Sequence, residues 1–203
     1  MTQNNLQPVP SAFALPLITG LLVVAGLYAS SLYSYLLFHS LVELFNVLTA
    51  FVIFVLAWHT RRIQDNQYLL FIGVASLFTG ALDLLHTLAY KGMGIFSGYT
   101  ADLPTQLWIG FRYLAAVSFL VAPYFIARKA DVRKILTVYL VISVVLVLAI
   151  FSGRFPSCFI EGAGLTPFKI YSEYVIIFIF LAALGLLLRQ RDSFDRGVLL
   201  LMA

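Results

Sequence analysis

The sequence predicts an all-α integral membrane protein, a polytopic bundle of six complete transmembrane helices followed by the start of a seventh. Hydrophobic residues make up 62% of the 203-residue chain and charged residues only 11%, a balance far from that of a water-soluble domain. The apolar residues also form continuous runs, and a helix needs about 20 such residues to cross a bilayer. A β-barrel would instead show alternating segments of about ten residues.

Six apolar runs are long enough to cross the membrane. In chain order they are residues 11–30, 35–58, 68–90, 107–127, 135–151 and 170–188. The first run lacks the basic segment and the small-residue cleavage site of a signal peptide, so we expect it to be retained. A last run, residues 197–203, is too short to cross and is interpreted as the beginning of a seventh span, cut off at the end of this chain.

The basic residues predict the orientation. They cluster after the second, fourth and sixth spans, which is the positive-inside pattern: Arg61, Arg62, Arg128, Lys129, Arg133, Lys134, Arg189, Arg191 and Arg196. We therefore expect a multi-pass membrane protein with its N-terminus and the inner ends of the even-numbered spans in the cytoplasm. Because the net charge of +4 arises at helix ends, it does not indicate nucleic-acid binding.

The chain has no repeat or flexible linker, so residues 1–203 are expected to form one transmembrane domain, truncated at its C-terminal end. Two outer connections, residues 91–106 and 152–169, are rich in Gly and Pro and are expected to form folded caps. The single cysteine, Cys158, excludes an intramolecular disulfide and is interpreted as a passive loop thiol.

Several ionisable side chains interrupt the apolar spans. Each costs on the order of 3 kcal/mol at the bilayer centre unless it is paired or hydrated. Helical spacing places them on shared faces: His39 with Glu43, Asp83 with His86 and then Tyr90, and Trp108 with Arg112. Because neighbouring spans run in opposite directions, these three faces reach the same layer in the outer half of the membrane.

The chemistry of this layer admits more than one function. Arg112 is expected to pair with Glu43 or Asp83, because its planar fork suits a carboxylate. His39, Glu43, Asp83 and His86 also form a ligand set suited to a transition metal such as zinc, iron or copper, and the two histidines could equally hold haem. A third interpretation is a purely structural hydrogen-bond network. Glu173 either joins this site or pairs with Lys169.

Separated motifs resemble one known family. They are His39-Ser40-Leu41-Val42-Glu43, Leu82-Asp83-Leu84-Leu85-His86-Thr87, Tyr90-Lys91-Gly92-Met93, Pro104-Thr105-Gln106-Leu107-Trp108-Ile109 and Arg112-Tyr113. In this order they resemble the third type of bacterial membrane-associated sensor domain, the MASE class. The resemblance implies an input module ahead of a histidine kinase or diguanylate cyclase, with further spans after Ala203. The positions that match its polar motifs are His39, Glu43, Asp83, His86, Tyr90, Lys91, Trp108 and Arg112.

We therefore expect a sensory input domain that binds a small ligand, metal or haem in its outer half and signals to a cytoplasmic output module, as a homodimer in the bilayer. Its candidate ligand-binding residues are the eight motif positions together with Glu173. The alternative is a small transporter or proton relay, which would need polar groups along a complete path, whereas the inner halves of the spans are apolar. No nucleophile motif or histidine-rich di-iron set is present, so we expect no enzymatic activity in this chain.

Overall fold

The computed structural model describes residues 11–61, 67–126, 128–129 and 131–190. Six helices among them are long and apolar enough to cross a membrane, which confirms the predicted polytopic α-helical fold. The expected start of a seventh span, residues 197–203, lies outside the described residues. The chain divides into two compact units, Met1–Val42 and Glu43–Ala203, and each is described by itself.

The first unit contains α1 (Ser11–Tyr33) and the beginning of α2 (Tyr35–Thr60). Ser34 separates the two helices and stabilises the start of α2, since its hydroxyl oxygen accepts a hydrogen bond from the backbone N–H of Leu37 at 3.3 Å. A serine in this role satisfies one of the backbone donors that the first helical turn leaves without an acceptor.

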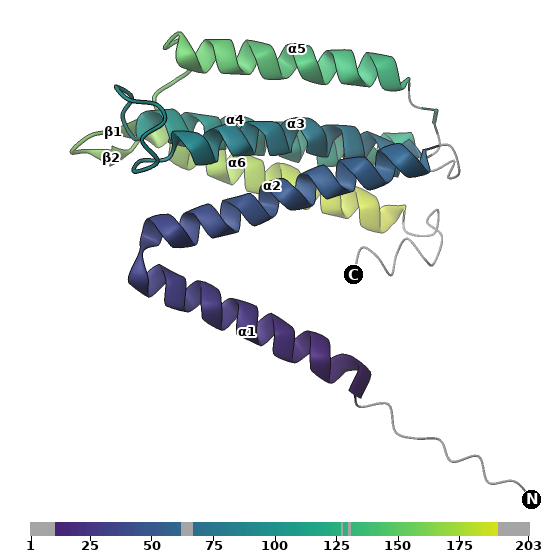
Figure 1. Ribbon diagram of the computed structural model, residues 1–203. Helices are drawn as coiled ribbons and strands as arrows, with labels where there is room; N and C mark the ends of the chain where they lie inside the picture. Colours follow the sequence, from purple (N-terminus) through teal and green to yellow (C-terminus); the bar gives the residue numbers. More distant parts are fainter. Residues whose placement is uncertain (1–10, 62–66, 127, 130, 191–203) are drawn as a thin grey trace, which may run out of the picture. The chain divides into compact units, whose positions relative to one another are not determined.

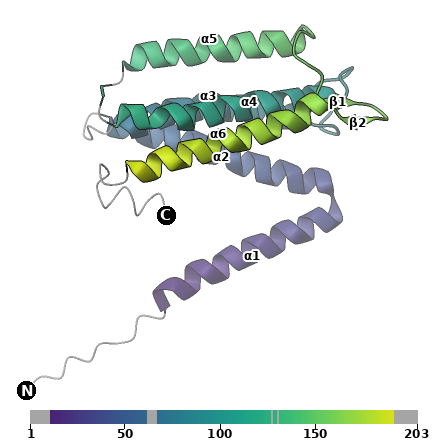
Figure 2. The same cartoon turned by 180° about the vertical axis from the view of Figure 1, so that it is seen from behind.

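The second unit is a helical bundle. It comprises the rest of α2, then α3 (Gln67–Ala89), α4 (Asp102–Val121), the short 3₁₀ helix η1 (Ala122–Phe125), α5 (Val132–Phe151) and α6 (Pro167–Arg189). Helix α4 packs against both α3 and α6, and α5 packs against α3 and α4. Figures 1 and 2 show α3, α4 and α6 running side by side with α5 along them.

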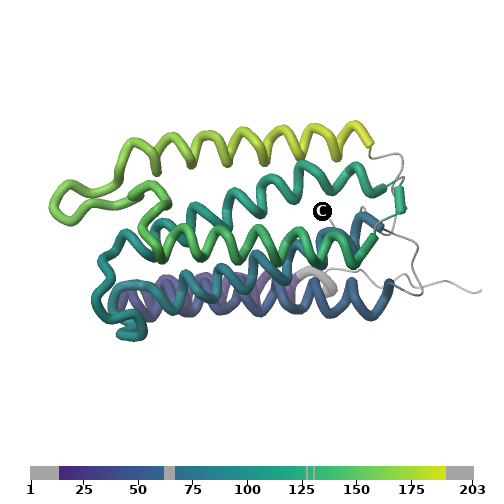
Figure 3. Tube along the Cα trace, turned by 90° about the horizontal axis from the view of Figure 1, so that it is seen from above, coloured from purple at the N-terminus to yellow at the C-terminus, as the bar shows by residue number. Residues whose placement is uncertain are grey.

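A small β-hairpin joins α5 to α6. Strands β1 (Phe159–Ile160) and β2 (Gly164–Leu165) pair antiparallel, and Gly162 supports the tight turn with a φ of 82°, a left-handed conformation that favours glycine. Figure 3 shows this connection projecting from one end of the bundle. We call this end of the second unit the hairpin end.

Helices α4, α5 and α6 each begin at least three residues earlier than the apolar runs predicted. Helix α4 starts at Asp102 within the expected connection 91–106, because Pro104 falls in the first turn, where a missing N–H costs no intrahelical bond. Helix α6 starts at Pro167 for the same reason, and the Thr166 side chain accepts a hydrogen bond from the backbone N–H of Lys169. Both outer connections are therefore shorter than expected.

The end of the bundle opposite the hairpin is filled by apolar side chains. Phe71 of α3 stacks on Phe125 at a ring-centroid distance of 4.5 Å, and Tyr139 of α5 is buried in the same cluster. The Tyr139 hydroxyl and the Ser118 hydroxyl lie 2.6 Å apart in a buried hydrogen bond between α5 and α4. These two buried hydroxyls thus satisfy each other, as buried hydroxyls must.

Candidate functional site in the transmembrane bundle

Helix α3 carries two buried polar side chains near the hairpin end. Asp83 is 6% exposed and His86 is 4% exposed, so the predicted pair of the third span does face the interior. They lie almost one helical turn apart, which places both side chains on the face that α3 turns toward its neighbours. Burial of an acid and an imidazole in an apolar bundle is costly unless other polar groups accompany them.

His86 connects α3 to α4. Its Nδ1 lies 2.8 Å from the backbone oxygen of Pro104, and because a carbonyl oxygen only accepts, Nδ1 is the atom that carries the hydrogen. In a neutral imidazole the lone pair then belongs to Nε2. A histidine whose Nδ1–H is held by a backbone carbonyl is the arrangement that orients many metal-binding histidines.

Close packing of α2 on α3 brings Glu43 of α2 to the level of Asp83 and His86 along the bundle. A Cβ added at Gly73 would lie 2.3 Å from the Ala57 Cβ, and one at Gly80 would lie 2.8 Å from the Ala50 Cβ. These two contacts are seven residues apart on both helices, so small residues let the backbones approach along a shared seam. One further heptad along this antiparallel register places Glu43 opposite Thr87, between Asp83 and the end of α3.

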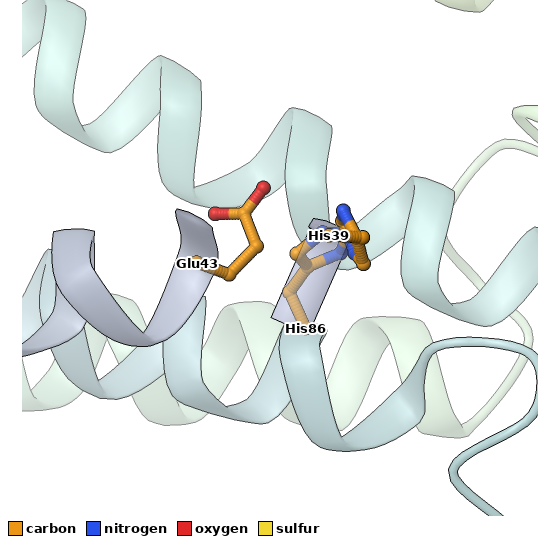
Figure 4. Close-up of side chains that lie close together, drawn as sticks. All are labelled: His39, Glu43 and His86. Atoms are coloured by element: carbon orange, nitrogen blue, oxygen red, sulfur yellow. The ribbon is translucent and has the colours of Figure 1, made fainter. Parts of the chain in front are cut away.

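The carboxyl groups of Glu43 and Asp83 are hydrogen-bonded to each other, and Arg112 acts electrostatically on Asp83. Ligand atoms of Glu43 and His86 lie within 4.8 Å of one another. Figure 4 shows His39 and Glu43 on successive turns of α2, with His86 on α3. We call Glu43, Asp83 and His86 the acid–histidine cluster.

Arg112 of α4 departs from its expected role. Among the described residues it forms no ion pair with Glu43 or Asp83, and its buried Nε has no hydrogen-bond partner. Its guanidinium carbon instead lies 5.5 Å from the centre of the Trp108 ring and 5.3 Å from that of Phe180. The expectation of a direct carboxylate partner is therefore wrong, because aromatic rings on α4 and α6 hold the guanidinium beyond ion-pair distance from both acids.

A cavity of about 290 Å³ lies between α4 and α6. Trp108 and Arg112 line it from α4, and Glu173, Tyr174 and isoleucines line it from α6. Glu173 also pairs with Lys169, whose Nζ lies 2.6 Å from its Oε1. Glu173 thus makes the local ion pair that the four-residue spacing allowed, while its side chain still borders the cavity that Arg112 enters.

Buried polar side chains thus lie inside helices that are long and apolar enough to cross a membrane. The family model MASE3, a membrane-associated sensor domain, matches residues 30–203. The chain belongs to the MASE3 family. No curated protein and no solved structure matches it.

The remaining MASE3 motif positions lie further toward the hairpin end. The Tyr90 ring stands edge-on to the His86 ring at a centroid distance of 6.5 Å. The Lys91 side chain is 74% exposed and forms an ion pair with Glu161 at 3.7 Å. Lys91 therefore joins the two outer connections to each other and lies outside the buried acid–histidine cluster.

Sequence reasoning missed two residues that hold the second outer connection on this MASE3 bundle. The Asp102 Oδ1 accepts hydrogen bonds from the backbone N–H groups of Cys158 at 2.6 Å and Phe159 at 2.8 Å. Gln106 donates from Nε2 to the backbone oxygens of Phe155 and Pro156 at 3.2 Å. The available signal was an acidic residue two positions before a proline, which is typical of a helix N-terminus.

Proposed function

We propose that this MASE3 chain is a sensory input domain whose signal binds at the acid–histidine cluster and is relayed to a cytoplasmic output module of the histidine kinase or diguanylate cyclase type. The observation that supports this most is the hydrogen bond between the carboxyl groups of Glu43 and Asp83. Two acids held together inside membrane-spanning helices are costly. A bound cation would offset much of that cost, which gives the cluster an affinity for ligand.

The donor set favours a transition metal as the signal or as a resident cofactor. Glu43 and Asp83 offer carboxylate oxygens, and His86 offers Nε2 because Nδ1 is held by the Pro104 carbonyl. Imidazole and carboxylate together suit zinc, iron or copper. His39, one turn before Glu43 on the same helix, is proposed as a further ligand on the basis of that spacing.

The relay is proposed to run through α4. His86 ties α3 to the start of α4 through its hydrogen bond to the Pro104 backbone oxygen, so a ligand that binds His86 can shift α4 relative to α3. Helix α4 in turn packs against both α3 and α6. Such a ligand shifts the output only if it binds one helix arrangement better than another. The opposite ends of these helices, which carry the basic residues, are proposed to face the cytoplasm of a bacterial inner-membrane protein that acts as a homodimer.

The apolar core at the opposite end argues against a transporter. Tyr68, Phe71 and Val74 of α3 are buried there together with Tyr139 of α5. Within the described residues this cluster takes the place that a continuous polar path would need. A polar cluster closed off by this apolar core fits a receptor better than a channel.

The metal content of the purified chain tests the proposed function. We expect the protein in mild detergent to retain a transition metal, or to bind added Zn²⁺, and we expect Glu43→Gln and His86→Ala to lose it. An absorption spectrum recorded on the same samples detects haem. His59→Ala is the matched control, since His59 lies at the far end of α2 and bonds to the Val55 backbone oxygen.

The relay has its own test. With a diguanylate cyclase module joined after the chain, addition of the metal should change the cyclase rate, and His86→Ala should remove that response. If no metal or haem binds, and Glu43→Gln and His86→Ala merely unfold at lower temperature, the cluster is a structural network and the proposal fails.

A further inference from the structure

The cavity between α4 and α6 is lined by a positively charged side chain, Arg112, that has no anionic partner among the described residues. Arg112 lines the cavity, and its guanidinium forms no ion pair within those residues. Its Nε is buried with no hydrogen-bond partner. An arginine is always charged, and one within a membrane-spanning helix needs an anionic or hydrated partner.

The nearby acids are already engaged with other groups. Asp83 is hydrogen-bonded to Glu43 and affects Arg112 only electrostatically. Glu173 faces the same cavity but is held by Lys169 at 2.6 Å, and the Lys169 Nζ itself lies 5.3 Å from the centre of the Trp108 ring. The two cations and one acid around the cavity leave it with an excess of one positive charge.

We propose that this cavity binds an anionic oxygen group, a carboxylate or a phosphate, attached to a small apolar body. The planar fork of arginine matches these groups with two parallel hydrogen bonds. The Trp108 and Phe180 rings flank the guanidinium and provide apolar surface for the rest of the ligand. A volume of about 290 Å³ is at the lower end for small-molecule sites, which excludes haem or a whole lipid but admits a small organic acid or a lipid headgroup.

This site goes beyond the proposed function, because it does not require a metal at the acid–histidine cluster. The two sites are nevertheless neighbours: Arg112 acts electrostatically on Asp83. An anion bound to the guanidinium weakens that interaction. An anion in the cavity would therefore change the electrostatic environment of the acid–histidine cluster. The cavity would thus be a second input site in the same bundle.

The test uses the fluorescence of Trp108 in the full chain, in nanodiscs of zwitterionic phosphatidylcholine. Trp58→Phe removes the other tryptophan of the chain and leaves Trp108 as the reporter. Benzoate supplies a carboxylate on a flat apolar ring, with neutral benzamide as its matched control, and inorganic phosphate supplies the anion alone. Nanodiscs that contain phosphatidylglycerol present a phosphate on a lipid headgroup.

We expect a saturable change in Trp108 emission with benzoate or phosphate, or upon inclusion of phosphatidylglycerol, and none with benzamide. A response to the soluble anions identifies a small ligand, and a response to phosphatidylglycerol alone identifies the headgroup. Arg112→Gln should weaken binding by about tenfold or more, whereas Arg133→Gln, which removes an exposed charge at the start of α5, should have no effect. No response to any of the three anions, or equal binding by Arg112→Gln, would overturn the proposal.

A second variant keeps the test decisive if Arg112→Gln does not fold. Glu173→Gln removes the negative charge from the cavity lining and frees Lys169, so anion binding should become tighter. Unchanged or weaker binding by Glu173→Gln contradicts the proposal. The metal content of the same samples is an independent measurement, so loss of anion binding with metal retained separates this inference from the proposed function.

Discussion

The carboxylate of Asp102 accepts a hydrogen bond from the backbone N–H of Cys158 at 2.6 Å, across a sequence separation of 56 residues. The same oxygen also accepts from the N–H of Phe159. One side chain in the first turn of α4 thereby fixes the start of the β-hairpin. The buried Cys158 belongs to a core cluster with Ile109 of α4 and Ile176 of α6, so this anchor positions the helices that border the α4/α6 cavity.

Removal of the Asp102 carboxylate should loosen the hairpin connection. Asp102→Ala leaves two backbone N–H groups without their acceptor, and we expect a loss of about 2 kcal/mol in the free energy of unfolding. Asp102→Asn is the matched control, because its amide oxygen can still accept both bonds. Thermal unfolding in detergent measures the difference. Equal melting temperatures for the two variants would show that the anchor contributes nothing.

The Cys158 thiol should be unreactive at neutral pH. Burial, and then the nearby Asp102 carboxylate, raise the pKa of Cys158 from its ordinary value near 9 to about 12, although Lys169 opposes this shift. Because the thiolate is the reactive form, bimane labelling at pH 8 should be at least about a hundredfold slower than labelling of glutathione, and denaturation should abolish the difference. Fast labelling of the folded chain would contradict this prediction.

The same shift affects stability at alkaline pH. A thiol whose pKa is higher in the folded state stays neutral while the unfolded chain ionises, so folding becomes less favourable as pH rises above about 9 toward 12. Below pH 9 the thiol is neutral in both states and has no effect. Cys158→Ser, which does not titrate in this range, should lose less stability between pH 8 and 11 than the unmodified chain.

The close approach of α2 and α3 should not tolerate a methyl group. Gly73→Ala would place a Cβ 2.3 Å from that of Ala57, and such overpacking costs about 1–3 kcal/mol. The control is Gly185→Ala, where nothing lies within 4 Å of an added Cβ. Addition of Ala57→Gly to the Gly73→Ala chain should recover most of the lost stability. If Gly73→Ala had the same melting temperature as the Gly185→Ala control, the close approach of α2 and α3 at Gly73 would be contradicted.

The two lysine ion pairs near the hairpin end should differ in importance. Lys91 and Glu161 are 74% and 55% exposed and 3.7 Å apart, so Lys91→Ala should change the unfolding free energy by less than about 1 kcal/mol. Lys169 is 13% exposed and 2.6 Å from Glu173, and its loss leaves an acid within α6 without its partner. Lys169→Ala should therefore lower the melting temperature more than Lys91→Ala, and the reverse order would refute this comparison.

Helix boundaries show where sequence reasoning loses accuracy. The apolar runs predicted the start of α2 and the end of α5 at the residues where the structure has them. The start of α4 was predicted too late, because Asp102, Pro104 and Gln106 do not belong to an apolar run. Hydropathy reports only the part of a helix that faces lipid or core, whereas the first turn of α4 is polar because it holds the hairpin connection.

The sequence by itself determined the class of the protein. Its apolar runs are long enough to cross a bilayer and lack the alternating pattern of β-strands, so they indicate membrane-spanning helices. The ordered motifs from His39 to Arg112 indicated the sensor family, which the family comparison confirmed. Both signals are local, since the hydropathy of a run and the spacing within a helix do not depend on contacts with distant residues.

Only the tertiary structure decided how the polar residues combine. Helical spacing placed Glu43, Asp83 and Arg112 in one layer, but it could not distinguish the hydrogen bond between the two acids from an ion pair with Arg112. That choice depends on the small-residue seam between α2 and α3 and on the aromatic rings that hold the Arg112 guanidinium toward α6. Contacts between helices are set by packing, to which residues far apart in the chain contribute together.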